Sequence, residues 1–259
     1  MPKYGKDSQG LRNAFLTILL FPVAMADLYG ECLSSTYSKK FVCKPGFDPI
    51  LSLKNWSIPV CPKQGLIFIG DSLTLELRDV FSCMCPSNKV ELLGAKGTKL
   101  ALSKILRERG KMFDKDSIIV INFGLWFNID NHKRYLKEVH KVRRELYILK
   151  KERSHNLANV VFVTTTAQHF CSKGGVYKGQ NRRKCCNVIN LNTFRQDYAM
   201  KFLIEPLNLT YFDAFKVTKK WFRAHPGEKG DCTHLCSNEN GPLILFGLEF
   251  LSFIQHIQL

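Results

Sequence analysis

The sequence lacks the features that would build a membrane-embedded protein or a structural zinc site. Beyond residue 26, no apolar run reaches the roughly 20 residues that a membrane-spanning helix needs. Cys83-x-Cys85 and Cys232-x-His234-x-Cys236 bring candidate ligands close together. Structural zinc sites, however, separate their paired cysteines by about two to four residues. We therefore expect no metal site.

Acidic residues are also scarce, with 22 Asp and Glu against 38 Lys and Arg and a formal net charge of +16. No recognised nucleic-acid-binding motif accompanies this charge, so nucleic acid is not an expected partner. Much of the basic charge falls in one predicted helix over residues 132–153. Two interpretations are open: a solvated helix face, or a surface that attracts an acidic partner such as an anionic glycan or a membrane. The basic residues of this helix are Lys133, Arg134, Lys137, Lys141, Arg143, Arg144, Lys150, Lys151 and Arg153.

The N-terminal segment has the pattern of a secretory signal peptide. Basic residues in the first twelve positions precede an apolar run over residues 14–25, and Ala24-Met25-Ala26 has the small-x-small form that signal peptidase accepts. We expect residues 1–26 to be removed by cleavage after Ala26. The alternative is an uncleaved anchor of a Golgi enzyme, and membrane association is expected only in that case.

The ten cysteines all follow this segment, and an even number behind a signal peptide predicts disulfide bonds in an oxidising compartment. Adjacent Cys185 and Cys186 are expected to take different partners. Asn55-Trp56-Ser57 and Asn208-Leu209-Thr210 are glycosylation sequons, so Asn55 and Asn208 are candidate acceptor sites. These patterns predict a secretory protein of the Golgi lumen or the extracellular space.

Short apolar strands alternate with helical segments, which predicts an α/β three-layer sandwich around a central parallel sheet, with flavodoxin-like topology. Residues 27–65 read as a cysteine-containing lead-in, and residues 66–259 as one domain. A long loop over residues 170–189 interrupts the alternation. The predicted strands cover residues 66–69, 90–93, 118–121, 160–163 and 209–212, and the predicted helices begin at 73 and cover 132–153, 191–204, 215–222 and 242–254.

Two short motifs carry the chemistry. Gly70-Asp71-Ser72-Leu73 follows an apolar strand, and a glycine turn that presents a serine between a strand and a helix is the construction of a nucleophile elbow. Asp231-Cys232-Thr233-His234 lies downstream. His234 can accept the proton of Ser72, and Asp231 can orient the imidazole through its other nitrogen. We expect Asp71 to stabilise the elbow through local backbone hydrogen bonds.

Other polar groups fall at the same predicted edge of the sheet. Asn122 ends a strand and is a candidate oxyanion donor, together with the Ser72 backbone N–H and, as a third donor, Gly94. The alternative for Asn122 is a cap at the end of its strand. Trp126 is either a core residue or a platform for a sugar ring.

The combination of Gly70-Asp71-Ser72-Leu73, Asn122-x-Gly124-x-Trp126 and Asp231-Cys232-Thr233-His234 resembles the PC-esterase branch of the SGNH/GDSL superfamily. This branch includes the trichome-birefringence-like polysaccharide O-acetyltransferases and the lumenal domain of sialate O-acetyltransferase. The resemblance runs from about Cys61 to the C-terminal helix. It implies a Ser72–His234–Asp231 triad and no metal. Thr164-Thr165-Thr166-Ala167-Gln168-His169-Phe170 also resembles a family segment, which implies that His169 lies at the mouth of the site; the alternative for His169 is a structural role. Many plant members have Trp after the motif His, where this chain has Leu235.

The resemblance implies O-acyl chemistry on glycans through the serine. The expected activity is a glycan or polysaccharide O-acetyltransferase with no resident cofactor, which takes its acyl group from a donor such as acetyl-CoA. A secreted carbohydrate acetylesterase is the first alternative, because it differs only in using water as the acceptor. A non-catalytic glycan-binding protein is the second. The expected partner is a glycan acceptor, and the basic surface would suit an acidic one.

Overall fold

The computed structural model describes residues 60–94, 102–127, 129–153, 157–177, 185–226, 230–237 and 242–258, together with Cys32 and Thr36. The expected signal segment, Asn55 and nearly all of the expected lead-in lie outside the described residues. Within the described part of the chain, no helix combines the length and apolarity needed to cross a membrane.

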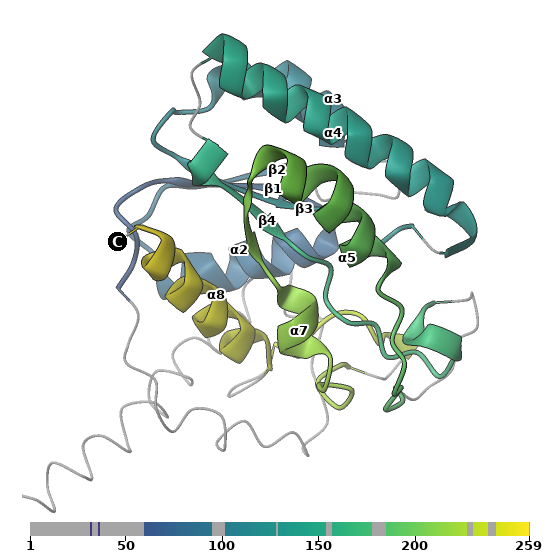
Figure 1. The fold of residues 1–259 in the computed structure, drawn as a ribbon. Helices are drawn as coiled ribbons and strands as arrows, with labels where there is room; N and C mark the ends of the chain where they lie inside the picture. Colours follow the sequence, from purple (N-terminus) through teal and green to yellow (C-terminus); the bar gives the residue numbers. More distant parts are fainter. Residues whose placement is uncertain are drawn as a thin grey trace, which may run out of the picture.

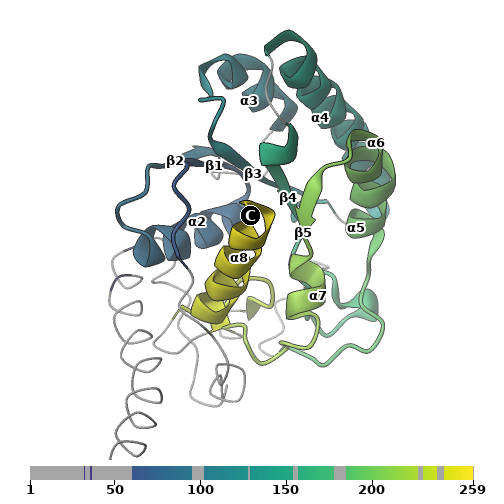
Figure 2. The ribbon, with the colours of Figure 1, turned by 60° about the vertical axis from the view of Figure 1, so that its left-hand side comes forward.

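The sheet has five strands in the order β2-β1-β3-β4-β5, and every neighbouring pair is parallel. This is the flavodoxin-like order, and it confirms the expected α/β fold with a central parallel sheet. Figure 2 shows the strands side by side in this order. The strands are β1 (Leu66–Gly70), β2 (Val90–Gly94), β3 (Ile118–Asn122), β4 (Val160–Val163) and β5 (Thr210–Phe212).

Helices cover both faces of the sheet (Figure 1). One face carries α2 (Ser72–Met84), α7 (Ala214–Thr218) and α8 (Pro242–Gln258). The other face carries α3 (Leu102–Arg109), α4 (His132–Arg153) and α5 (Phe194–Ala199), and α5 continues through a π-helical turn, Met200–Ile204, into α6 (Glu205–Leu207). Short 3-10 turns lie at Gly110–Met112, Ile129–Asn131, Leu157–Asn159 and Lys173–Gly175.

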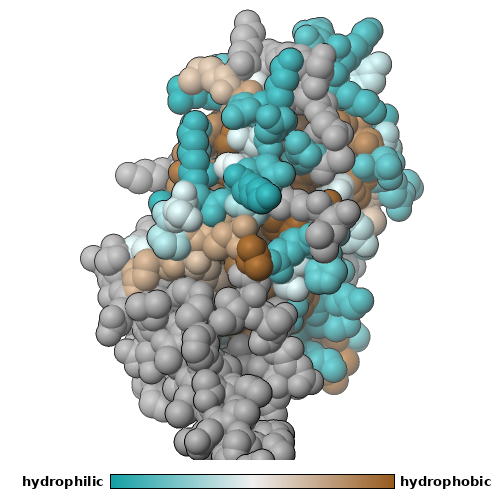
Figure 3. All heavy atoms as spheres, turned by 90° about the vertical axis from the view of Figure 1, so that its left-hand side faces the viewer, coloured by the Kyte–Doolittle hydropathy of each residue, from teal (hydrophilic) through white to brown (hydrophobic). Residues whose placement is uncertain are grey.

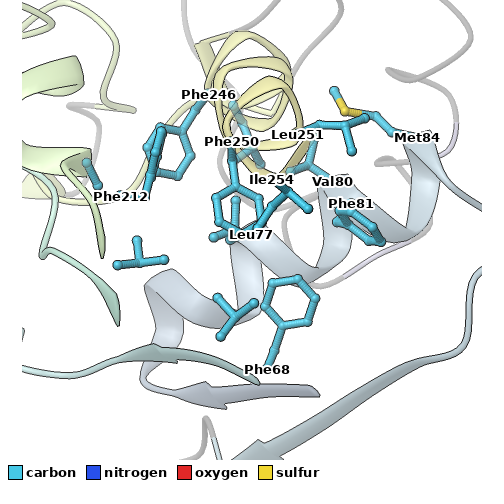
Figure 4. Packing of buried hydrophobic residues seen from close by; sticks show 14 of the residues in the cluster. Phe68, Leu77, Val80, Phe81, Met84, Phe212, Phe246, Phe250, Leu251 and Ile254 are labelled. Atoms are coloured by element: carbon cyan, nitrogen blue, oxygen red, sulfur yellow. The ribbon is translucent and has the colours of Figure 1, made fainter. Parts of the chain in front are cut away.

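The two faces of each strand feed separate hydrophobic cores, because successive side chains of a strand point to opposite sides. Phe68 of β1 packs toward α2 and α8, with its ring centroid 5.9 Å from that of Phe81 and 6.4 Å from that of Phe250 (Figure 4). Its neighbours Ile67 and Ile69 join the opposite core beneath α3 and α4. Burial on both faces explains why the strands read as continuous apolar runs.

Most elements match the sequence expectation, and the differences have local causes. α3 was not expected, since only Leu102, Ser103 and Leu106 are buried in a helix otherwise rich in charge. The helix expected from residue 191 begins at Phe194, whose backbone N–H donates to Asn192 Oδ1 at 3.0 Å. α7 ends earlier than expected, at Thr218, and α8 extends to Gln258.

Disulfide bonds hold the segments around the sheet together. Cys185 and Cys186 bond to different partners, Cys232 and Cys171, as expected for adjacent cysteines. Cys236 is also disulfide-bonded. The bonds between described cysteines are Cys32–Cys83, Cys61–Cys85, Cys171–Cys186 and Cys185–Cys232. They fit an oxidising environment, secretory or extracellular.

The basic residues of α4 whose side chains the structure describes are exposed. Hydrophilic side chains gather over the upper part of the face in Figure 3, at the height of α3 and α4 in Figure 1. The exposed ones on α4 are Lys133, Arg134, Lys137, Lys141, Arg143, Arg144, Lys150 and Lys151. One ion pair within the helix joins Lys141 to Glu138 at 3.8 Å.

Candidate active site

Ser72 lies at the switch between the two halves of the sheet, where the chain leaves β1 and enters α2. Gly70 pairs in register with Gly94 of β2 and Asn122 of β3, so three strands end on one row. A Cβ on Gly70 would collide with the Asn122 carbonyl oxygen and with Thr74 Oγ1. Glycine is required here because the turn runs against its neighbour strand without space for a side chain. Crevices at this edge of open parallel sheets are where ligands bind.

Asp71 stabilises the turn that presents Ser72. Its side chain caps α2 by accepting from Leu73 N at 3.1 Å, and its second oxygen accepts from Leu125 N at 3.2 Å. This confirms the expected local role of Asp71 and adds a tether to the loop after β3. Burial raises the pKa of Asp71 to about 6, against the opposing effect of these two backbone hydrogen bonds.

Ser72, His234 and Asp231 form one hydrogen-bonded chain. Ser72 Oγ lies 2.8 Å from His234 Nε2, although the two residues are 162 positions apart. His234 Nδ1 lies 2.7 Å from Asp231 Oδ2. The other carboxylate oxygen, Oδ1, accepts from the backbone N–H groups of Thr233 at 3.0 Å and His234 at 3.1 Å. The structure thus brings the three predicted residues together, in the order that a base and its orienting group require.

The electrostatics of the chain favour an ionised Asp231 and a basic His234. Burial disfavours the charge of Asp231, but the hydrogen bonds and charge of His234 outweigh it and lower the carboxyl pKa to about 2. Burial also opposes a charged His234, yet Glu76 where it is ionised, together with the hydrogen bond and charge of Asp231 and the charge of Asp71, raises the pKa of its imidazole above the ordinary value. His234 is therefore suited to take up a proton from Ser72.

Glu76 is a buried acid next to the hydrogen-bonded series of Ser72, His234 and Asp231, and it was not among the residues predicted for the site. It lies one turn after Ser72 on α2, is 2% exposed, and accepts a hydrogen bond from the backbone N–H of Leu235. Burial raises its pKa to about 8, so at neutral pH the carboxyl is mostly protonated. The available signal was a charged residue on the apolar face of an amphipathic helix.

The loop that carries Asp231 and His234 is held from several sides. Gln168 donates from Nε2 to Thr233 Oγ1 at 3.1 Å and accepts from Arg195 Nη1 at 3.0 Å. Arg195 also donates to the Phe127 carbonyl oxygen at 2.7 Å, which links this loop to the segment after β3. The Cys185–Cys232 disulfide attaches the residue next to Asp231 to the far end of the long loop.

A cleft of about 310 Å³ opens beside His234. Its described lining includes the aromatic residues Trp126, Phe170 and Tyr177, and Asp231 and His234 are the ionisable residues among the described ones that line it. Trp126 and Tyr177 are 51% and 46% exposed. Trp126 is therefore not a core residue, and the interpretation as a platform for a sugar ring stays a prediction. The described lining residues are Leu125, Trp126, Gln168, Phe170, Tyr177, Gly230, Asp231, Thr233 and His234.

The structure does not support Asn122 as an oxyanion donor. Its side-chain amide donates to the Val163 carbonyl oxygen at 2.8 Å, and the residue is 2% exposed. It therefore ties the ends of β3 and β4 together, in agreement with the alternative that Asn122 caps the end of its strand. Asn122 also lines a small cavity of about 10 Å³, with Thr74, Glu76 and Thr166. Each of these four side chains has a buried oxygen without a hydrogen-bond partner among the described residues.

The expectation that His169 lies at the mouth of the site is wrong. His169 is 1% exposed and does not line the cleft, because both of its ring nitrogens are engaged inside the protein. The oxyanion candidates that remain are backbone groups. Ser72 N–H lies in the first turn of α2, where a helix has no carbonyl to accept it. Gly94 ends β2 with φ 105° on the neighbouring strand.

The sequence matches no known protein family and shows no significant similarity to a curated protein. The identification of a candidate active site therefore depends on the geometry of its residues. Within the described residues, no group of three or more His, Cys, Asp and Glu side chains could hold a metal ion. The sequon residue Asn208 is exposed, at the end of α6, and its neighbour Thr210 begins β5.

Proposed function

We propose that this protein is a serine-dependent O-acyltransferase, which carries an acetyl group on Ser72 and transfers it to a glycan hydroxyl. The observation that supports enzymatic activity most strongly is the hydrogen-bonded chain from Ser72 Oγ through His234 to Asp231 Oδ2, with contacts of 2.8 and 2.7 Å. The acetyl group and the glycan come from the resemblance to the PC-esterase branch.

In the proposed reaction, Ser72 Oγ attacks the acyl carbonyl carbon of the donor while His234 Nε2 takes the serine proton. His234 then gives this proton to the departing donor group, and the acyl group stays on Ser72 as an ester. An acceptor hydroxyl loses its proton to His234 Nε2 and attacks the acyl carbon, and Ser72 regains a proton when the new ester leaves. Asp231 accepts from His234 Nδ1 throughout and stabilises the imidazolium.

The negative oxygen that forms in each attack needs donors close to Ser72. The backbone N–H of Ser72 lies at the positive end of α2, a 13-residue helix. Gly94 is the second candidate, on the neighbouring strand end. One such donor is worth about 3 kcal/mol of transition-state stabilisation. The turn that Gly70 makes possible therefore positions one of the two candidate donors.

Acceptor choice separates a transferase from an esterase. The aromatic walls of the cleft, with half-exposed Trp126 and Tyr177, suit the apolar face of a sugar ring and support a glycan acceptor. Water as the acceptor would give the carbohydrate acetylesterase, which uses the same triad. A non-catalytic glycan-binding protein is disfavoured, since a retained Ser–His–Asp chain at hydrogen-bonding distances has no purpose in binding alone. The Golgi lumen is the proposed compartment of a transferase.

The test follows a labelled acetyl group. Incubation with a labelled acetyl donor should label wild-type protein on Ser72, and Ser72→Ala should abolish both the label and turnover. Ser82→Ala, on the same helix, is the matched control and should behave like wild type. Full activity in Ser72→Ala would refute the serine mechanism.

A second step distinguishes the two acceptors. When a glycan is added to the labelled protein, a transferase should pass label to the glycan in proportion to glycan concentration. Label that appears only as free acetate at every glycan concentration would identify an esterase instead.

A further inference from the structure

Two buried histidines lie directly behind the proposed triad. His169 follows β4 and is 1% exposed, and His225 follows α7 and is 5% exposed. Their ring centroids are 4.9 Å apart, and His169 Nδ1 lies 2.7 Å from His225 Nε2. The proposed reaction uses neither ring, so this close contact needs a separate explanation.

The outer nitrogen of each ring contacts a backbone carbonyl. His169 Nε2 lies 3.1 Å from the Lys219 oxygen, and His225 Nδ1 lies 2.8 Å from the His234 oxygen. A carbonyl oxygen can only accept a hydrogen bond, so both outer nitrogens must carry protons. A neutral imidazole has one N–H, so two neutral rings would turn two lone pairs toward each other. A third proton between the inner nitrogens converts this repulsion into a hydrogen bond.

We propose that His169 and His225 share one proton between their inner nitrogens, and that the resulting chain positions His234 through its backbone carbonyl. The proposal rests on the proposed function, because its effect on catalysis passes through His234. His225 is accordingly a positioning residue, which acts on the reaction only through the loop that carries the base.

The same two histidines hold this loop at two neighbouring points. The backbone N–H of His169 donates to the Cys232 carbonyl oxygen at 3.0 Å, and the His225 ring donates to the His234 carbonyl oxygen. The loop is thus fixed on both sides of Thr233. A displacement of about 1 Å of a catalytic group can cost about 100-fold in rate, so the tether matters for the Ser72–His234 contact.

Burial opposes the shared proton, whereas the 2.7 Å contact between the two inner nitrogens favours it. Burial lowers the pKa of both rings, and that of His225 to about 3, where the charge of His169 adds to the effect. Two other charged groups act on His225: Asp231 favours its protonated form, and protonated His234 opposes it. The Lys219 carbonyl, which His169 faces, favours the protonated form of His169. Because burial lowers the pKa of both rings, the pair loses the shared proton at a lower pH than an exposed histidine would. One ring must then leave its carbonyl, and kcat should decline on the alkaline side of that pH.

Nuclear magnetic resonance of protein with nitrogen-15-labelled histidine tests the shared proton without any substrate. We expect three protons over the four ring nitrogens of the pair, one of them strongly shifted downfield. Exposed His140 and His256 provide reference titrations in the same sample. Two neutral rings with no proton between them, at every pH where the protein is folded, would overturn the proposal and leave the triad assignment untouched.

Kinetics of two variants test the positioning role. His225→Asn keeps an amide N–H close to the place of Nδ1 but cannot share a proton, whereas His225→Leu removes both. We expect His225→Leu to lower kcat by about 100-fold with little change in KM. His225→Asn should recover most of kcat and lose the alkaline decline. His256→Leu on α8 is the matched control.

Wild-type kcat in His225→Leu, or an equal loss in both variants, would refute the positioning role. If His225→Leu does not fold, an alkaline decline that persists in His225→Asn refutes it equally. If wild type shows no acyl transfer and no ester hydrolysis, the proposed function fails, and the resonance experiment still decides whether the proton is shared.

Discussion

Replacement of Asp231 by asparagine tests the orientation of the proposed base with little change in shape. The amide oxygen of Asn can still accept from the backbone N–H groups of Thr233 and His234, which contact Asp231 Oδ1 at 3.0 and 3.1 Å. Its NH2 group then faces His234 Nδ1, which lies 2.7 Å from Asp231 Oδ2. Since NH2 only donates, Nδ1 must become the acceptor and the imidazole proton moves to Nε2. His234 can then no longer accept the Ser72 proton.

We expect Asp231→Asn to lower kcat by about 10⁴-fold, which corresponds to ~5 kcal/mol in the barrier. Hydrolysis of a chromogenic acetyl ester measures the loss, and thermal unfolding checks that the fold is retained. Because Asp231 helps to raise the pKa of His234, the acidic limb of the remaining activity should move to lower pH. Asp213→Asn, which changes the capping residue of α7, is the control and should keep full activity. A folded Asp231→Asn variant within tenfold (about 1.4 kcal/mol) of wild type would refute the reasoning.

Three further predictions concern stability and modification. Burial raises the pKa of Glu76 from 4.5 to about 8, so between these pH values the unfolded chain releases the proton while the folded protein keeps it, and the free energy of unfolding falls as the pH rises. Glu76→Gln should flatten this decline in thermal unfolding scans, and an unchanged pH dependence of stability would contradict the prediction. Gly70→Ala should lower the free energy of unfolding by about 1–3 kcal/mol or more, whereas Gly65→Ala, whose Cβ would lie 3.3 Å from the Lys89 oxygen, should cost less; equal denaturation midpoints would count against the close approach. Protein secreted from eukaryotic cells should carry a glycan on exposed Asn208, which peptide N-glycosidase removes and Asn208→Gln prevents.

The sheet and the triad could be predicted from the sequence because their signals are local. Each buried strand is a short apolar run, and the Ser72 turn and the Asp231-to-His234 segment are contiguous motifs that follow or approach strand ends. α4 was predicted over residues 132–153, the same bounds that the structure has. Parallel topology then brings the two motifs to one edge of the sheet.

The residues that were misplaced or missed depend on tertiary partners. The sequence places Asn122 at a strand end, but only the neighbouring strand shows that its amide donates to the Val163 carbonyl oxygen. His169 likewise follows a strand, and its ring turns inward because His225, 56 positions away, meets it there. The helical pattern places Glu76 on an apolar face, but only the fold shows that its carboxyl meets the backbone N–H of Leu235.

The place of α8 in the fold has a consequence for how the chain is synthesised. This last helix packs beside α2, the helix that begins with Ser72, and helps to cover the first strand of the sheet. The chain between the end of α2 at Met84 and the start of α8 at Pro242 takes roughly 8 to 30 s to translate. During that interval the apolar side of α2 lacks its native packing partner, α8. A nascent chain of this protein should therefore depend on chaperones until α8 emerges, and a ribosome-bound chain stalled before Pro242 should stay protease-sensitive.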